Sequence, residues 1–307
     1  MTARVSHGPD PRDGRPYDMT EDLRLAVDVA LATERPLLLS GDPGSGKSSL
    51  APFLAHERHL RYYEHVVTSR TQATDLLWTF DSVRRLADAQ AHRMHGNDGG
   101  YLQPGVLWWS LAPESARTRG GLLKPPDRLD PLERFYRQER AKGAVVLIDE
   151  IDKADPDMPN GLLVPLGSQE FTIAETGATV CREDGVDPYL VVITTNGERE
   201  LPPAFLRRCI TFELPPPTED SLVRIAELHL AHENVAMDDE TMEIVMLLAE
   251  ELTKAREEKN VSRDRLPSTA EFLDALRACR TMGLRPGHPK WHLLRNLTLL
   301  KPRQSGG

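Results

Sequence analysis

The sequence has no apolar run long enough to cross a bilayer, and its polar start, MTARVSHGPDPRDGRP, lacks the apolar core of a signal peptide. It is also poor in cysteine. Cys181, Cys209 and Cys279 lie far apart and form no CxxC motif, which indicates reduced thiols with a structural role. These absences predict a cytoplasmic protein without a membrane partner.

An excess of positive charge is missing as well. The net charge is −9, which argues against broad binding of nucleic acids or anionic membranes. Ten histidines are present, but His56/His59 and His229/His232, at helical i, i+3 spacing, have no Cys or acidic partner at a matching spacing for a metal site. The 307 residues, 39% hydrophobic and 28% charged, have the composition of a globular protein with one large and one smaller domain.

A glycine-rich stretch, GDPGSGKS at 41–48, fills every fixed position of the phosphate-binding loop pattern. An apolar strand pattern precedes it and a helical pattern follows, so the helix dipole would favour an anion there. Glycines let the backbone amides form one nest, Lys47 would lie between the β- and γ-phosphates, and Ser48 would be one ligand of Mg²⁺. The candidate nucleotide-binding residues are Gly41, Asp42, Pro43, Gly44, Ser45, Gly46, Lys47, Ser48 and Ser49.

Two acidic residues follow a second apolar strand, VVLIDEID at 145–152. Strand carboxyl ends line the ligand crevice of an α/β sheet, so Asp149 would hold Mg²⁺ through water and Glu150 would polarise the attacking water. A core strand ending in solvated acids is the alternative. The paired acids are typical of ATPases, and no Asn-Lys-x-Asp stretch for guanine recognition is present.

Two later stretches add polar groups. The strand VVITTN ends in Asn196, whose amide could orient the water beside the γ-phosphate, or could cap the turn before Gly197. The short helix LPPAFLRRC ends in Arg207 and Arg208, which could act in trans as an arginine finger or could pair with local acids on the surface.

Strand and helix patterns alternate up to the PPP at 215–217, and only helical patterns follow. This order predicts a three-layer α/β P-loop NTPase core with a parallel sheet, followed by a small all-helical lid. The expected limits are a flexible leader at 1–18, the core at 19–217 with an insertion at about 95–142, the lid at 218–300 and a frayed tail at 301–307. The pattern of residues 71–93 predicts one helix, and the alternation of apolar and polar residues at 170–184 predicts a hairpin.

These elements, in this order, resemble the MoxR-type AAA+ ATPases. The stretches that carry the resemblance are GDPGSGKS, LIDEIDKADPDMPNGLL, ITTNGERELPPAFLRRC and LPSTAEFLDAL, within roughly residues 20–285. The resemblance implies an ATP-hydrolysing hexameric ring that remodels or activates a partner, often a protein with a von Willebrand A domain. It also favours Arg208 over Arg207 as the finger, because in that family the finger directly precedes the following strand.

The chain departs from the family pattern in its lid. Thr269 stands roughly where many AAA+ proteins present an arginine, with Arg263 and Arg265 nearby. Thr68, Ser69 and Arg70 could form a polar switch for Glu150 or a solvated loop, and Tyr101, Trp108 and Trp109 could line a ring pore or pack beneath the insertion.

Three functions remain as hypotheses. The first is a ring-forming ATPase that remodels a partner. The second is a nucleotide-gated interaction module, and the third, disfavoured by the acidic balance, is a nucleic-acid motor.

Overall fold

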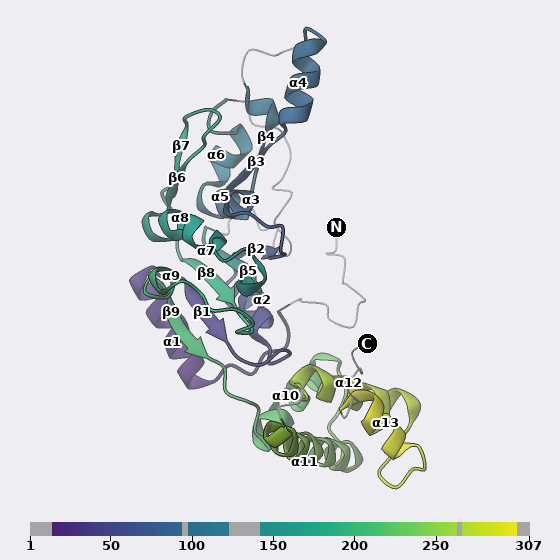
Figure 1. The fold of residues 1–307 in the computed structure, drawn as a ribbon. Helices are drawn as coiled ribbons and strands as arrows, with labels where there is room; N and C mark the ends of the chain where they lie inside the picture. The colour runs from purple at the N-terminus through teal and green to yellow at the C-terminus, as the bar shows by residue number, and fades with distance from the viewer. Residues whose placement is uncertain (1–13, 94–97, 123–141, 263–265, 300–307) are drawn as a thin grey trace. The chain divides into compact units, whose positions relative to one another are not determined.

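The computed structural model of the protein describes residues 14–93, 98–122, 142–262 and 266–299 (Figure 1). The tail, residues 1–13 of the leader, residues 95–97 and 123–141 of the insertion, Arg263 and Arg265 lie outside the described residues. Contacts group the chain into two compact units. The larger holds Glu21–Ser40 and Ala51–Phe212, and the smaller holds Arg15–Thr20, Gly41–Leu50 and the chain from Glu213 onward.

The larger unit is built on a five-stranded sheet in the order β2-β5-β8-β1-β9. In chain order these strands are β1 (Leu37–Ser40), β2 (Arg61–Val66), β5 (Ala144–Asp149), β8 (Tyr189–Thr194) and β9 (Ile210–Glu213). The pairings β2–β5, β5–β8 and β1–β8 are parallel, and every residue of β5 and β8 is buried, as expected for strands covered on both faces. The predicted α/β class with a parallel sheet is confirmed.

Helices cover this sheet. Helix α1 (Glu21–Thr33) buries Leu23, Val27 and Ala30 at helical spacing and contacts β1 and β8. Helix α5 (Val106–Leu111), buried along its whole length, contacts β2 and β5. Further helices of the unit are α2 (Leu50–Glu57), α6 (Pro113–Thr118), α7 (Met158–Gly161), α8 (Leu163–Ser168) and α9 (Pro203–Leu206).

The single helix predicted for residues 71–93 is wrong. The segment forms α3 (Ala73–Leu77), strand β3 (Trp78–Phe80) and α4 (Ser82–Gln90). Strand β3 pairs antiparallel with β4 (Leu102–Pro104), and the Trp78 ring stacks on Phe171 at 5.6 Å between centroids. Strand pairing and aromatic packing therefore override the local helical pattern. Helix α4, with no buried residue, projects beyond this pair of strands (Figure 1).

The predicted hairpin is confirmed as β6 (Glu170–Thr172) paired antiparallel with β7 (Thr179–Cys181). Its Phe171 also packs edge-on against Trp108. Tyr101, Trp108 and Trp109 are at most 5% exposed. These three aromatic side chains belong to the core, which removes the pore-lining alternative.

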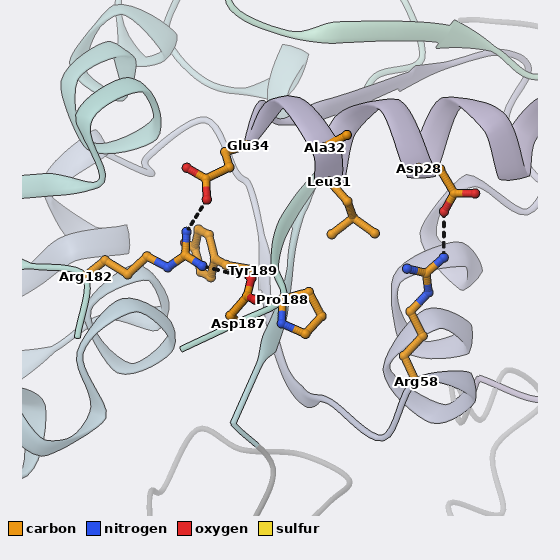
Figure 2. A pocket seen from close by; sticks show the side chains of 9 residues that line it. All are labelled: Asp28, Leu31, Ala32, Glu34, Arg58, Arg182, Asp187, Pro188 and Tyr189. Atoms are coloured by element: carbon orange, nitrogen blue, oxygen red, sulfur yellow. Dashed lines mark hydrogen bonds and ion pairs between the residues drawn. The ribbon is translucent and has the colours of Figure 1, made fainter. Parts of the chain in front are cut away.

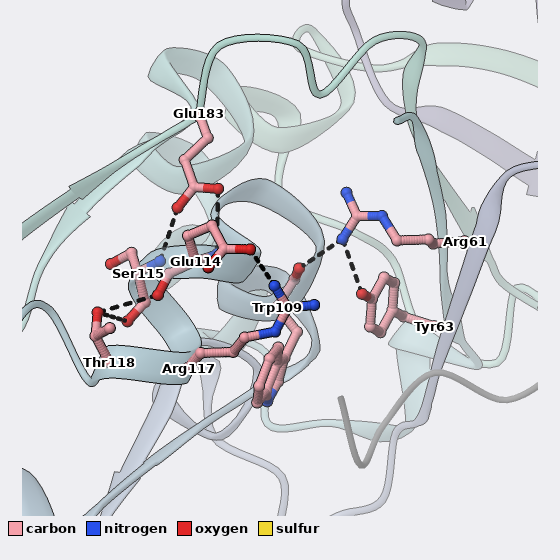
Figure 3. A network of polar contacts seen from close by, with 8 residues as sticks. All are labelled: Arg61, Tyr63, Trp109, Glu114, Ser115, Arg117, Thr118 and Glu183. Carbon is pink, nitrogen blue, oxygen red and sulfur yellow. Dashed lines mark hydrogen bonds and ion pairs between the residues drawn. The ribbon is translucent and has the colours of Figure 1, made fainter. Parts of the chain in front are cut away.

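Polar contacts link α5 to β2 and α6 to the segment after β7 (Figure 3). The Arg61 guanidinium, on β2, donates to the Tyr63 hydroxyl at 2.9 Å and to the Trp109 carbonyl at 3.1 Å. The Glu183 carboxylate accepts the backbone N–H of Ser115 at 2.7 Å, at the start of α6. The buried charge of Arg61 is thus hydrogen-bonded to a hydroxyl and to a backbone carbonyl, which is the condition for keeping it inside.

The smaller unit contains α10 (Glu219–His232), α11 (Asp239–Ser262), α12 (Thr269–Met282) and α13 (Trp291–Thr298). Its core includes Leu222, Leu248, Phe272 and Leu276. Ser268 and Glu271 form a capping box at the start of α12. The helical C-terminal region is therefore as predicted. None of the helices among the described residues is long and apolar enough to cross a membrane.

Candidate functional site

The phosphate loop connects β1 to α2 and has a backbone that requires glycine at three positions. Gly41, Gly44 and Gly46 have φ of 142°, 74° and 92°. Residues with a Cβ rarely adopt these backbone angles, so the glycine spacing in the sequence has a local steric cause. The loop ends in a single 3-10 turn, Lys47–Ser49, which leads directly into α2.

Lys47 and Ser45 are two polar side chains of this loop with buried polar atoms or limited exposure. Lys47 is 5% exposed, and its ammonium donates to the backbone carbonyls of Gly41 at 2.7 Å and Asp42 at 2.8 Å. The Ser45 hydroxyl oxygen is buried without a hydrogen-bond partner among the described residues. A positive-φ glycine loop with a lysine folded over it and a buried hydroxyl without a partner fits the phosphates of a nucleotide.

The smaller unit holds the same loop through residues that sequence reasoning missed. Arg256 of α11 forms an ion pair with the Asp42 carboxylate and donates to the Pro267 carbonyl at 2.6 Å. The Ser268 Cβ lies 2.6 Å from where a Cβ on Gly44 would be. In the sequence Arg256 stands within a run of charged residues that is typical of a solvated helix end, so no local signal marks it.

The two acids lie where the sequence places them, at the carboxyl end of β5. Asp149, 2% exposed, accepts a hydrogen bond from the Thr194 hydroxyl of β8 at 2.6 Å. The same hydroxyl accepts the backbone N–H of Glu150 at 2.8 Å. Thr194, which the sequence does not mark, therefore orients both acidic residues from the neighbouring parallel strand.

Glu150 has a left-handed backbone, with φ 60° and ψ 51°. Both oxygens of its carboxylate are engaged: Lys153 donates to one at 2.7 Å, and the Asn196 amide donates to the other at 3.4 Å. The hydrogen bond to Glu150 raises the pKa of Lys153. The structure thus brings Asn196 and Lys153 to the Glu150 carboxylate. A strained backbone at the end of a strand is typical of functional positions.

Asp152 explains how Asn196 is held. Asp152 as a whole is 3% exposed, and its Oδ2 accepts the backbone N–H groups of Asn196 at 3.1 Å and Glu198 at 2.9 Å. Oδ1 is buried without a hydrogen-bond partner among the described residues. Asp152 therefore fastens the segment after β8 to the segment after β5.

Arg207 and Arg208 follow α9 and are both exposed. Their backbone carbonyls accept hydrogen bonds from the Arg35 guanidinium, at 3.1 Å for Arg208. Within the described part of the chain, neither guanidinium has a hydrogen bond or an ion pair of its own, so the alternative of pairing with local acids is not seen. The Arg208 side chain lies 3.9 Å from the position of a Cβ on Gly167 of α8.

The segment after β2 forms a self-contained turn. Thr68 and Thr71 are hydrogen-bonded to each other at 3.1 Å through their hydroxyls, and the Thr68 hydroxyl accepts the Arg70 backbone N–H at 3.3 Å. Thr68, Ser69 and Arg70 are exposed. This arrangement is that of the solvated loop rather than of a switch on Glu150.

A cavity of about 380 Å³ lies at the opposite end of the strands from Asp149 and Glu150, where β8 begins (Figure 2). Its charged residues are already paired. Arg182 binds Glu34 at 3.1 Å and Asp187 at 3.3 Å, and Arg58 binds Asp28 at 2.9 Å. Because ligands of open α/β sheets bind at the strand carboxyl ends, this cavity is a poorer candidate than the loop and the acidic pair.

Comparison with known proteins gives a family for most of the larger unit. Residues 36–209 match the model of the AAA domain, dynein-related subfamily. Among solved structures, the chain is 18% identical to a RuvB mutant from Thermotoga maritima, with a TM-score of 0.43, covering 87% of this chain and 74% of that one. It is 16% identical to a candidate ATPase from Cytophaga hutchinsonii, with a TM-score of 0.40 and coverage of 90% and 79%. No curated protein matches the sequence.

Proposed function

Because this chain belongs to the AAA domain family, dynein-related subfamily, we propose that it is a MoxR-type AAA+ ATPase. In this proposal it binds and hydrolyses ATP with Mg²⁺ as a ring-forming oligomer and remodels or activates a partner protein. The family itself supports nucleotide binding by a P-loop ATPase. The subtype, the ring size and the partner are our inference.

The assignment of ATP hydrolysis rests on the contacts of the Glu150 carboxylate. A scaffold that only binds nucleotide needs the loop and not a carboxylate that contacts the amide of Asn196 at 3.4 Å. We assign Glu150 as the base that polarises the attacking water, and Asn196 as the group that orients that water. Lys153, bonded to Glu150 at 2.7 Å, holds the carboxylate in a defined position before substrate arrives.

Binding is assigned to the loop residues 41–49. The backbone amides after the three glycines would surround the phosphates, and Lys47 would leave the carbonyls of Gly41 and Asp42 to meet them. Ser48 and Asp149 would hold Mg²⁺, which usually takes only one or two protein ligands beside phosphates and water. When bound, the ion neutralises phosphate charge.

Assembly is assigned to Arg208. Its exposed guanidinium, which has no partner among the described residues, suits a finger that reaches the nucleotide of a neighbouring subunit. Arg207 remains the alternative finger. We propose a hexameric ring of chains, each with a core at 19–217 and a lid at 218–300, acting on a client that contains a von Willebrand A domain.

The test is Glu150→Gln, which keeps the size of the side chain and removes the base. The variant should bind ATP, release phosphate far more slowly than the wild type, and capture the client in a pull-down in the presence of ATP. Glu200→Gln makes the same chemical change at an exposed position nearby and is the matched control. Wild-type turnover by Glu150→Gln would contradict the assignment of the base.

A second function, a nucleotide-gated interaction module, would give a different result. There, wild-type turnover would be negligible, and ATP alone would drive assembly with the partner. Phosphate release measured with and without DNA would also separate both of these from a nucleic-acid motor, which DNA should stimulate.

A further inference from the structure

Arg256 is a buried charge that nothing in the nucleotide-site assignment uses. It is 8% exposed, although the side chain of Lys254 on the same helix is 64% exposed. A guanidinium is kept inside a protein only where its charge is paired and its N–H groups are bonded. Both conditions are met here, by the Asp42 carboxylate and by the Pro267 carbonyl. The position is therefore built for one specific contact with the phosphate loop.

Asp42 creates the need for that contact. It places a carboxylate inside a loop that is proposed to take a polyphosphate, and its own backbone carbonyl accepts the Lys47 ammonium at 2.8 Å. Its side chain is 42% exposed, so water and salt screen the charge only in part. An unpaired Asp42 would repel an incoming polyphosphate, and the repulsion would grow with the number of phosphate charges.

The same arginine also fixes the loop in space. Pro267, whose carbonyl it binds, directly precedes Ser268, and the Ser268 Cβ lies 2.6 Å from where a Gly44 Cβ would be. Arg256 thus holds the start of α12 and the first turn of the loop together. Only glycine at position 44 allows this close approach.

We propose that Arg256 is a positioning residue of the nucleotide site, which neutralises Asp42 so that the loop accepts a nucleoside polyphosphate. The inference rests on the proposed binding of nucleotide at Lys47. It deepens that proposal by naming the charge that the helical unit must supply to the loop. Arg256 acts through Asp42 and not by touching the phosphates.

The experiment is a double-mutant cycle on the full chain, with Kd for ADP and for ATPγS measured by calorimetry at low and high salt. Arg256→Gln should raise the Kd for ATPγS about tenfold, or about 1.4 kcal/mol. The loss should be smaller for ADP and should shrink at high salt. Asp42→Asn in the same chain as Arg256→Gln should bring the Kd back to within about threefold of the wild type. Lys254→Gln, which removes a positive charge from the same helix at an exposed site, is the matched control.

Each other outcome overturns a defined part of the reasoning. An unchanged Kd for Arg256→Gln, or the same increase for Lys254→Gln, refutes the proposal. A double variant that binds as weakly as Arg256→Gln would mean that Arg256 acts on the nucleotide directly. If Arg256→Gln does not fold, Arg256→Lys is the second variant. It keeps the charge beside Asp42 and loses one bond, so its Kd for ATPγS should rise by clearly less than tenfold; a rise of tenfold or more there refutes neutralisation of Asp42 as the role of Arg256. Absence of nucleotide binding by the wild type would instead refute the proposed function.

Discussion

Asp152→Ala should destabilise the sheet unit and slow ATP turnover, although Asp152 is not assigned a contact with nucleotide. The residue is 3% exposed, and its carboxylate accepts the backbone N–H groups of Asn196 and Glu198 at 3.1 and 2.9 Å. Hydrogen bonds to a charged group are each worth about 1.5–3 kcal/mol. The Oδ1 atom, buried without a partner among the described residues, offsets part of this gain, so the lower end of that range applies. The expected loss is about 3 kcal/mol for the two bonds.

Thermal unfolding and steady-state kinetics measure the two consequences. A loss of this size corresponds to roughly 6–12 °C in Tm for a domain of this size. Three of the four tryptophans, Trp78, Trp108 and Trp109, lie in the larger unit, and Trp291 lies in the smaller one, so tryptophan fluorescence mainly reports unfolding of the larger unit. Release of Asn196 from its place beside Glu150 should lower kcat by about 100-fold. KM should stay near the wild-type value, because the phosphate loop is not altered.

Two variants separate positioning from general damage. Asp152→Asn keeps an oxygen where both N–H groups donate but loses the charge that strengthens the two bonds, so it should lose about half of the stability that Asp152→Ala loses and recover part of the turnover. Asp157→Ala removes an exposed carboxylate from the same segment and should change neither quantity. If Asp152→Ala melted within 2 °C of the wild type and kept its kcat, a threshold well below the estimated shift, the role given to this carboxylate would be wrong.

Lys47→Ala removes the charge proposed to face the phosphates but leaves the loop backbone, so ATP binding measured by calorimetry should be largely lost while the fold remains; unchanged binding would contradict the phosphate-loop assignment. Arg208→Ala should leave ATP binding nearly intact and lower turnover on the order of 10³-fold, as for other arginine fingers. Mixing it with Glu150→Gln protein should restore partial activity, and no rescue would mean that one chain contains the whole site. Burial raises the pKa of Cys209 to about 11, so in the folded chain at pH 8 it should remain unmodified by a thiol reagent, while exposed Cys181 reacts first; early modification of Cys209 would show that its surroundings open.

Local features of the fold and site could be predicted because their causes lie within a few neighbouring residues. Gly41, Gly44 and Gly46 have positive φ because the turn itself requires it, and this requirement leaves a fixed spacing in the sequence. The apolar runs that end in Asp149 and in Asn196 mark buried strands whose carboxyl ends are polar. Their convergence follows from a parallel sheet, since all its strands end at one edge.

Contacts between distant segments could not be predicted, because they leave no local pattern. The 71–93 segment reads as helix by itself, and only pairing with β4 and stacking on Phe171 make its middle a strand. In the sequence, Thr194 and Asp152 look like ordinary polar residues. Their roles appear only because β5 and β8 are neighbours in the sheet, so that Thr194 reaches Asp149 at the end of β5 and Asp152 reaches Asn196 after β8. Arg256 is 214 residues from Asp42, and its role exists only because the chain folds back to bury that guanidinium against the loop. Backbone conformation is a property of neighbours in sequence, whereas the pairing of a buried charge is a property of neighbours in space.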